Sequence, residues 1–79
     1  MFSLFYEISS LKIYPNPVNG FLKIPSEETF EYQLFNVLGL KIASGKIKNE
    51  LNTEGLEKGI YQINLTHGRE SKVLMFIKD

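Results

Sequence analysis

Apolar and polar residues alternate in short stretches along most of the chain, with turn-forming residues between them. In residues 29–36, for example, Phe30, Tyr32 and Leu34 share one face, and polar side chains separate them. A period of two is typical of β-strands with one buried face, and β-branched and aromatic residues favour strands. We therefore expect an all-β domain. The expected strands are residues 11–14, 21–24, 29–36, 40–44, 46–51, 60–66 and 69–78.

Glycines and other turn formers set the expected ends of the strands. Gly45 separates residues 40–44 from residues 46–51, so we expect two strands there, and we expect Ile42 to face the core. Turns recur at regular intervals between about seven short strands, which is typical of two packed sheets. The predicted fold is an antiparallel, immunoglobulin-like β-sandwich.

The last expected strand is apolar on both faces, so its orientation must be inferred from its lysines. Two sets alternate along it: Val73, Met75 and Ile77 on one face, and Lys72, Leu74, Phe76 and Lys78 on the other. Burying a lysine without a partner is costly, so we assign the lysine face to solvent. Leu74 and Phe76 would then be exposed apolar side chains on a terminal strand, which indicates a surface that contacts another protein.

The composition excludes several classes of function. The chain has 79 residues, which fits one domain, and its net charge is zero. A balanced charge argues against a protein that binds nucleic acid through a basic surface. There is no cysteine, which excludes disulfides and thiolate metal sites. No apolar run approaches the roughly 18 residues that a membrane-spanning helix needs.

Residues that could carry catalysis are not found in a suitable pattern. His67 is the only histidine, and it stands beside Gly68 in an expected hairpin turn. Acid–base catalysis needs an orienting partner for a histidine, and a metal site needs further ligands. No serine has a histidine placed to activate it, and no glycine-rich phosphate loop is present. We expect no catalytic residue, no metal site and no cofactor.

The first ten residues differ from the rest of the chain. Residues 1–8 are apolar but short, with no basic start and no small-residue cleavage site, so they do not resemble a secretory signal peptide. They are a linker remnant, a first edge strand, or a result of where the chain was cut or its reading frame begins. We divide the chain into an N-terminal extension at residues 1–10 and one domain at residues 11–79.

A proline-rich corner separates the first two expected strands. Pro15 and Pro17 each fix φ and lack an N–H donor, so they stiffen the corner. Asn19-Gly20 can supply the positive φ with which the chain reverses. Turn chemistry alone favours a structural role for the corner. However, Tyr14-Pro15-Asn16-Pro17 followed by Gly20 resembles the opening motif of the C-terminal sorting domains of the type IX secretion system.

A second stretch adds to this resemblance. The sorting domains carry an aromatic residue, then Asn or Asp, and then Gly, and here Phe35, Asn36 and Gly39 have that spacing. Leu40 stands where the family usually has a polar residue, which is a mild departure. We expect a turn with Gly39 at a position of positive φ.

The third stretch is the strongest match to the family. Leu56, Gly59 and Tyr61 form the pattern Leu-x-x-Gly-Ile-Tyr. The resemblance implies that the leucine plugs the end of the sandwich, the glycine turns the chain, and the tyrosine enters a core strand. We expect Gly59 to have a positive φ. Family members also end in an apolar strand bracketed by lysines, although Met75 stands where many have a basic residue.

The resemblance covers residues 11–79 and implies a function. A sorting domain of this family is a non-catalytic address at the C-terminus of a cargo protein, which crosses the inner membrane by a separate signal peptide. The outer-membrane translocon recognises the address, and a sortase-like protease commonly removes it at the cell surface. We therefore expect an upstream cargo domain and transit through the periplasm to the outer-membrane surface or exterior. The present chain would be an excised domain or an orphan reading frame.

The resemblance also supplies candidate recognition residues. They are Tyr14, Pro15, Asn16, Pro17, Gly20, Asn36, Gly39, Leu56, Gly59 and Tyr61, with Lys72, Leu74, Phe76 and Lys78 of the last strand. A homodimer formed through an edge strand is left open. The alternative function is an immunoglobulin-like or fibronectin-like adhesion module that binds protein or carbohydrate. Phe2, Phe5 and Tyr6 would then be candidates for an exposed aromatic patch.

Overall fold

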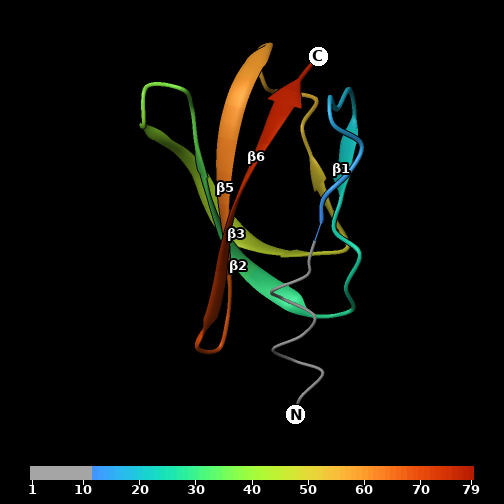
Figure 1. Ribbon diagram of the computed structural model, residues 1–79, viewed down its shortest axis with the longest axis vertical. Coiled ribbons are helices and arrows are strands. Elements are labelled where there is room, and N and C mark those ends of the chain that lie inside the picture. Colours follow the sequence, from blue (N-terminus) through green and yellow to red (C-terminus); the bar gives the residue numbers. More distant parts are fainter. Residues whose placement is uncertain (1–11) are drawn as a thin grey trace.

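The computed structural model describes residues 12–79, which contain six β-strands and no helix (Figure 1). The strands are β1 (Phe21–Lys23), β2 (Thr29–Phe35), β3 (Lys41–Lys48), β4 (Glu50–Asn52), β5 (Gly59–His67) and β6 (Glu70–Lys78). This confirms the all-β prediction, although six strands form and not seven. In this part of the chain no helix is long and apolar enough to cross a membrane. The predictions for the N-terminal extension, and for Phe2, Phe5, Tyr6 and Leu11, concern residues outside the described range.

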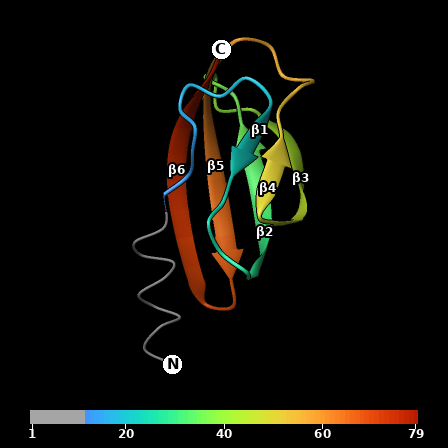
Figure 2. The same ribbon diagram turned by 90° about the vertical axis from the view of Figure 1, so that its right-hand side faces the viewer.

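The strands form two antiparallel sheets that lie in two layers (Figure 2). The larger sheet has the strand order β3-β2-β5-β6, and the smaller one pairs β1 with β4. Side chains from both layers make one apolar core between the sheets. Its buried members are Val18, Leu22, Ile24, Phe30, Leu34, Leu51, Tyr61, Ile63, Leu65 and Phe76. The more specific assignment to the immunoglobulin-like sandwiches stays a prediction.

The two-stranded sheet is short but contributes fully to the core. Leu22 and Leu51 are direct cross-strand partners, and both are buried. The bend from β3 into β4 occurs at Asn49, which has a φ of 74°. Asparagine tolerates this left-handed conformation better than most residues. The carbonyl of Asn49 accepts a hydrogen bond from the amide of Ile24 at 2.6 Å, which fixes the end of β1 against the bend.

Gly45 does not divide two strands, so that prediction is wrong. It lies inside the continuous strand β3 and pairs with Tyr32 of β2. A Cβ placed on Gly45 would lie 3.4 Å from the aromatic ring of Tyr32, so the ring covers the glycine. The two strands expected at residues 40–44 and 46–51 are therefore replaced by the long strand β3 and the short strand β4.

The prediction of a first strand at residues 11–14 is also wrong, because Tyr14 makes only an isolated bridge to Lys23.

A β-bulge explains a second error in this region. Leu34 pairs with Ala43, whereas the next residue of β2, Phe35, pairs with Lys41. Ile42 is the extra residue, and one extra residue reverses which side chains face the core. Ala43 therefore packs against the core and Ile42 is 43% exposed. The expectation that Ile42 faces inward is wrong for this reason.

Candidate recognition surface

The proline-rich corner is exposed at its prolines and anchored on both sides. The Tyr14–Pro15 and Asn16–Pro17 peptide bonds are both cis. Before the corner, the amide of Lys23 donates to the carbonyl of Tyr14 at 2.6 Å. After it, Val18 is completely buried in the core. Neither Asn19 nor Gly20 has a positive φ, so the prediction that this pair reverses the chain through a left-handed residue is wrong.

The corner is bonded to the last residues of the chain. The amide of Val18 donates to the carbonyl of Ile77 at 2.8 Å, and the amide of Asp79 donates to the carbonyl of Val18 at 2.8 Å. The side chain of Asn16 accepts a hydrogen bond from the amide of Ile77 at 2.8 Å. The corner thus adds a short parallel bridge to the outer edge of β6, where that strand ends.

Thr53 joins the corner to both the third motif and the C-terminus. Its amide and its hydroxyl both donate to the carbonyl of Gly20, at 2.9 and 2.5 Å. The carbonyl of Thr53 accepts hydrogen bonds from the amide of Leu56 at 3.0 Å and from the ammonium of Lys78 at 2.9 Å. Thr53 and Lys78 are both buried. No local pattern in the sequence distinguishes Thr53, because Gly20 and Lys78 are distant from it in sequence.

The third motif closes the end of the core. Leu56 is partly buried and packs against the core, and Gly59 begins β5 with a φ of 153°, so the predicted positive φ is confirmed. The hydroxyl of Tyr61 donates to the carbonyl of Glu57 at 2.6 Å. Its ring stacks on that of Phe76 with a centroid distance of 5.6 Å. Tyr61 therefore holds the loop before β5 and contacts β6 at the same time.

The second motif forms the turn between β2 and β3. The side-chain oxygen of Asn36 accepts hydrogen bonds from the amides of Leu38 and Leu40, at 2.9 and 3.1 Å. The amide of Gly39 donates to the carbonyl of Asn36 at 2.9 Å. Gly39 has a φ of 84°, which confirms the predicted positive φ and explains the glycine. Asn36 therefore organises the whole turn.

The predicted orientation of the last strand is wrong. Phe76 and Lys78 are buried, and Leu74 is half-buried against the core. The opposite face is the exposed one, with Val73 at 57%, Met75 at 60% and Ile77 at 45%. The lysine face can point inward because Lys78 reaches the carbonyl of Thr53, so its ammonium is buried with a partner. The exposed apolar side chains of β6 are therefore not those expected.

The three motifs and the C-terminus meet at one end of the molecule (Figures 1 and 2). We call this end, formed by residues 14–20, 36–40, 53–59 and 77–79, the motif end. Most candidate recognition residues belong to it or support it. Lys72 and Leu74 do not, because Lys72 lies near the hairpin that joins β5 and β6 at the opposite end and Leu74 is at the middle of β6.

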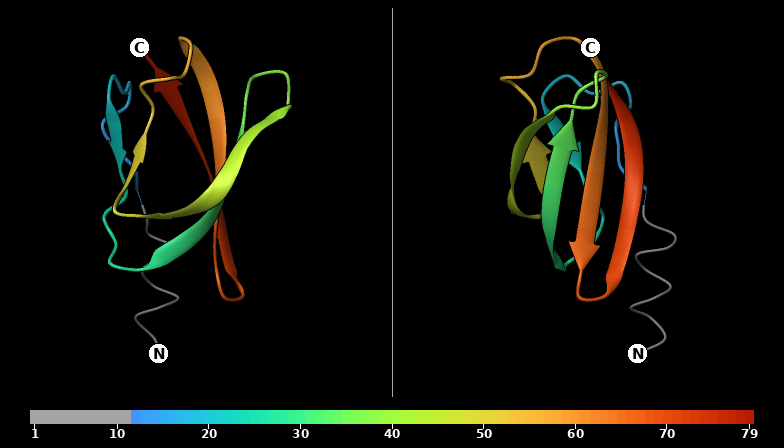
Figure 3. Two further views of the ribbon diagram at one scale, coloured as in Figure 1. Left: turned by 180° about the vertical axis from the view of Figure 1, so that it is seen from behind. Right: turned by 90° about the vertical axis from the view of Figure 1, so that its left-hand side faces the viewer.

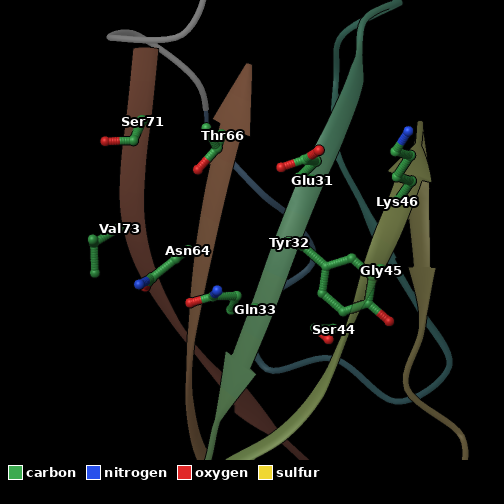
Figure 4. Close-up of a pocket in the computed structure, with 10 residues that line it drawn as sticks. All are labelled: Glu31, Tyr32, Gln33, Ser44, Gly45, Lys46, Asn64, Thr66, Ser71 and Val73. Carbon is green, nitrogen blue, oxygen red and sulfur yellow. The ribbon is translucent and has the colours of Figure 1, made fainter. Parts of the chain in front are cut away.

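The outer face of the larger sheet carries a polar concavity away from the motif end. Polar side chains of four adjacent strands line it, including Glu31, Gln33 and Asn64 (Figure 4). The one aromatic side chain there, Tyr32, lies against Gly45. It therefore does not form a free stacking platform for a sugar. Within residues 12–79 no group of three or more histidines and acidic residues is placed to hold a metal.

The comparison with protein families identifies the domain. A family model described as a secretion system C-terminal sorting domain matches residues 12–79. The chain belongs to this family. A comparison with curated proteins found no match. As a type IX sorting domain, the chain is a signal recognised by the type IX secretion machinery, and its family is generally non-catalytic. Membership implies a secreted protein that travels to the cell surface or exterior.

Proposed function

We propose that this sorting domain directs an upstream cargo protein from the periplasm through the outer-membrane translocon. The domain itself carries out no chemistry and needs no cofactor. A sortase-like protease removes it while the cargo is attached at the surface. In this proposal residues 11–79 act as the signal within an immunoglobulin-like sandwich, and residues 1–10 act as a linker to the cargo.

We further propose that the translocon contacts the motif end. The observation that carries this proposal is the hydrogen-bond network around Thr53, Asn16 and Lys78, which joins two motifs to the C-terminus. Such a network joins the exposed proline corner, the loop that begins at Thr53 and the end of β6 into one rigid surface. Rigid surfaces bind with a smaller entropic cost than loops that must be ordered on contact.

A reporter fusion tests the function. The full chain is fused to the C-terminus of a reporter that carries its own inner-membrane signal peptide. We expect the reporter outside the cell in a host with the type IX system and in the periplasm of a strain without the translocon. Retention of the reporter in the periplasm of both strains would contradict the proposal and favour the adhesion module.

A further inference from the structure

The outer edge of β6 has no neighbouring strand over most of its length. β6 stands last in the strand order β3-β2-β5-β6 and is the red strand at the side of the larger sheet (Figure 3). Within residues 12–79, the corner at Val18 is the one other segment that pairs with β6 besides β5. The amide and the carbonyl of Ile77 are bonded there, to Asn16 and to Val18. We call the remainder of this edge, residues 70–76, the open edge.

The pairing of β5 with β6 shows which backbone groups point outward from the open edge. The register of this pair is unbroken along the whole of β6. In an antiparallel strand, successive residues direct their N–H and C=O groups to alternate sides. Since Ile77 directs both groups outward, Ser71, Val73 and Met75 do so too. The open edge therefore presents a row of hydrogen-bond donors and acceptors at these three residues.

The open edge lacks the features that protect the other strand edges of the described chain. Lysines, bulges and short strands usually prevent pairing between exposed edges. β3 contains lysines and the bulge at Ile42, while β1 and β4 are short. The outward-facing residues of the open edge are uncharged, and Val73 and Met75 are 57% and 60% exposed. Ile77 and its cross-strand partner Ile60 extend this apolar strip.

The open edge is complementary to itself. It runs from the hairpin turn between β5 and β6 to the corner, and Val73 is at its centre. An antiparallel second copy centred there places Val73 opposite Val73 and Ser71 opposite Met75. All outward-facing residues of one copy then meet outward-facing residues of the other, which allows about six hydrogen bonds. The strand of the second copy ends in its hairpin turn where the corner begins to cover the edge.

Other registers of the same pairing fit less well. A shift by one residue places outward-facing groups opposite groups that bond to β5, so no ladder forms. A centre at Lys72 places two lysines directly opposite each other, and like charges in this position are destabilising. A centre at Leu74 requires Ser71 to bond to Ile77, whose amide and carbonyl are already bonded to the corner. The centre at Val73 avoids these conflicts.

We propose that two copies of the domain associate through their open edges, in antiparallel orientation and centred on Val73. A two-fold axis at this point makes the contact identical for both copies, and their larger sheets become one continuous sheet. On the outer face, Val73 and Met75 of one copy contact Val73 of the other. The pairing uses residues outside the motif end and does not depend on recognition by the translocon. Its contact area is small, so the dimer is weak and forms at high protein concentration.

Cysteine cross-linking tests the proposed register, because the chain contains no cysteine. Val73→Cys in the full chain places two thiols on opposing residues whose Cα atoms are about 5.5 Å apart, within the range of a disulfide. Met75→Cys is the matched control, because Met75 is similarly exposed but its two copies would be about 14 Å apart. We expect Val73→Cys to form covalent dimers at least about tenfold faster under mild oxidation. Equal rates would contradict the register.

Sedimentation equilibrium of the full chain measures the association itself. We expect the weight-average mass to rise from that of one chain toward that of two as the protein concentration increases. Val73→Lys places like charges opposite each other at the two-fold axis and should weaken the dimer at least about fivefold at an unchanged melting temperature. Ile42→Lys makes the same change at an exposed position of β3, on the other edge of the sheet, and should leave association unchanged.

Two results of the sedimentation experiment would overturn the proposal. They are a mass that stays at one chain up to the limit of solubility, and an equal loss of association in both lysine variants. The reporter fusion separates a second copy from another protein. If the chain stays monomeric while Val73→Lys lowers export at an unchanged melting temperature, the open edge binds the secretion machinery and its assignment to a second copy is wrong.

Discussion

The side chain of Asn16 accepts a hydrogen bond from the amide of Ile77 at 2.8 Å, although the two residues are 61 positions apart. This contact connects the opening motif of the domain to its last strand. The amide of Ile77 faces the outer edge of β6, where no further strand of the described chain supplies a partner. The side chain of Asn16 therefore supplies the hydrogen-bond acceptor that a neighbouring strand would otherwise provide.

The first prediction concerns this contact. Asn16→Ala should lower the free energy of unfolding by about 0.5–1.5 kcal/mol, because it removes one hydrogen bond at a partly solvated edge. Urea denaturation measures the loss. Asn19→Ala is the control, since Asn19 is an exposed residue of the same corner. Equal effects of the two substitutions would show that the Asn16 contact does not stabilise the fold.

The second prediction concerns the buried lysine. Lys78→Met keeps the apolar stem and removes only the ammonium that donates to Thr53. We expect a loss of about 1–2 kcal/mol, since a bond to a charged donor is worth more than a neutral one. Lys48→Met, at an exposed position of β3, should change stability by less than about 0.5 kcal/mol. A more stable Lys78→Met protein would mean that the cost of burying the charge exceeds the gain from the bond.

The third prediction concerns the two faces of β6. Phe76→Ala should cost about 3–5 kcal/mol, a large part of the stability of a small domain, because Phe76 is 1% exposed. Met75→Ala, on the adjacent exposed position, should stay within about 0.5 kcal/mol. Thermal unfolding followed by circular dichroism compares the two. The reverse order of effects would place Met75 in the core and Phe76 in solvent.

The fourth prediction concerns the glycine of the third motif. Gly59 has a φ of 153°, which side chains rarely adopt, so Gly59→Val should cost about 1–3 kcal/mol. Gly55→Val is the matched control in the loop before β5, where the backbone is ordinary and a Cβ meets no atom within 4 Å. If both variants melt at the temperature of the unchanged protein, backbone conformation does not explain Gly59.

Sequence reasoning succeeded where the alternation was local and unambiguous. Residues 60–66 were expected to form a strand and lie in β5, and the alternating residues Tyr61, Ile63 and Leu65 are buried. The prediction that Gly45 ends a strand failed, because a glycine can lie inside a strand when a neighbouring side chain covers it. Here the ring of Tyr32 covers it, and Tyr32 belongs to another strand.

The face of β6 could not be predicted from its own residues. Both faces carry apolar side chains, so the choice depended on whether the lysines could be buried. That depends on the carbonyl of Thr53, which lies 25 positions from Lys78. The family motifs could be recognised in the sequence. Their position together at one end of the molecule depends on contacts between residues that are distant in sequence, and these contacts could not be predicted. The residues that join them, Thr53 and Val18, carry no signal in the sequence.

The most direct test of whether the secretion machinery recognises the motif end is to measure export of a reporter fused to surface variants of the domain. Tyr14→Ser with Lys58→Ser changes two exposed side chains of the motif end, while Arg69→Ser changes the hairpin at the opposite end. The fusions are compared in a host with the type IX system after equal melting temperatures have been confirmed. We expect the double variant to lower export about tenfold, equivalent to about 1.4 kcal/mol of lost binding, and Arg69→Ser to leave export unchanged. Unchanged export by the double variant, or an equal loss with Arg69→Ser, would contradict recognition through the motif end.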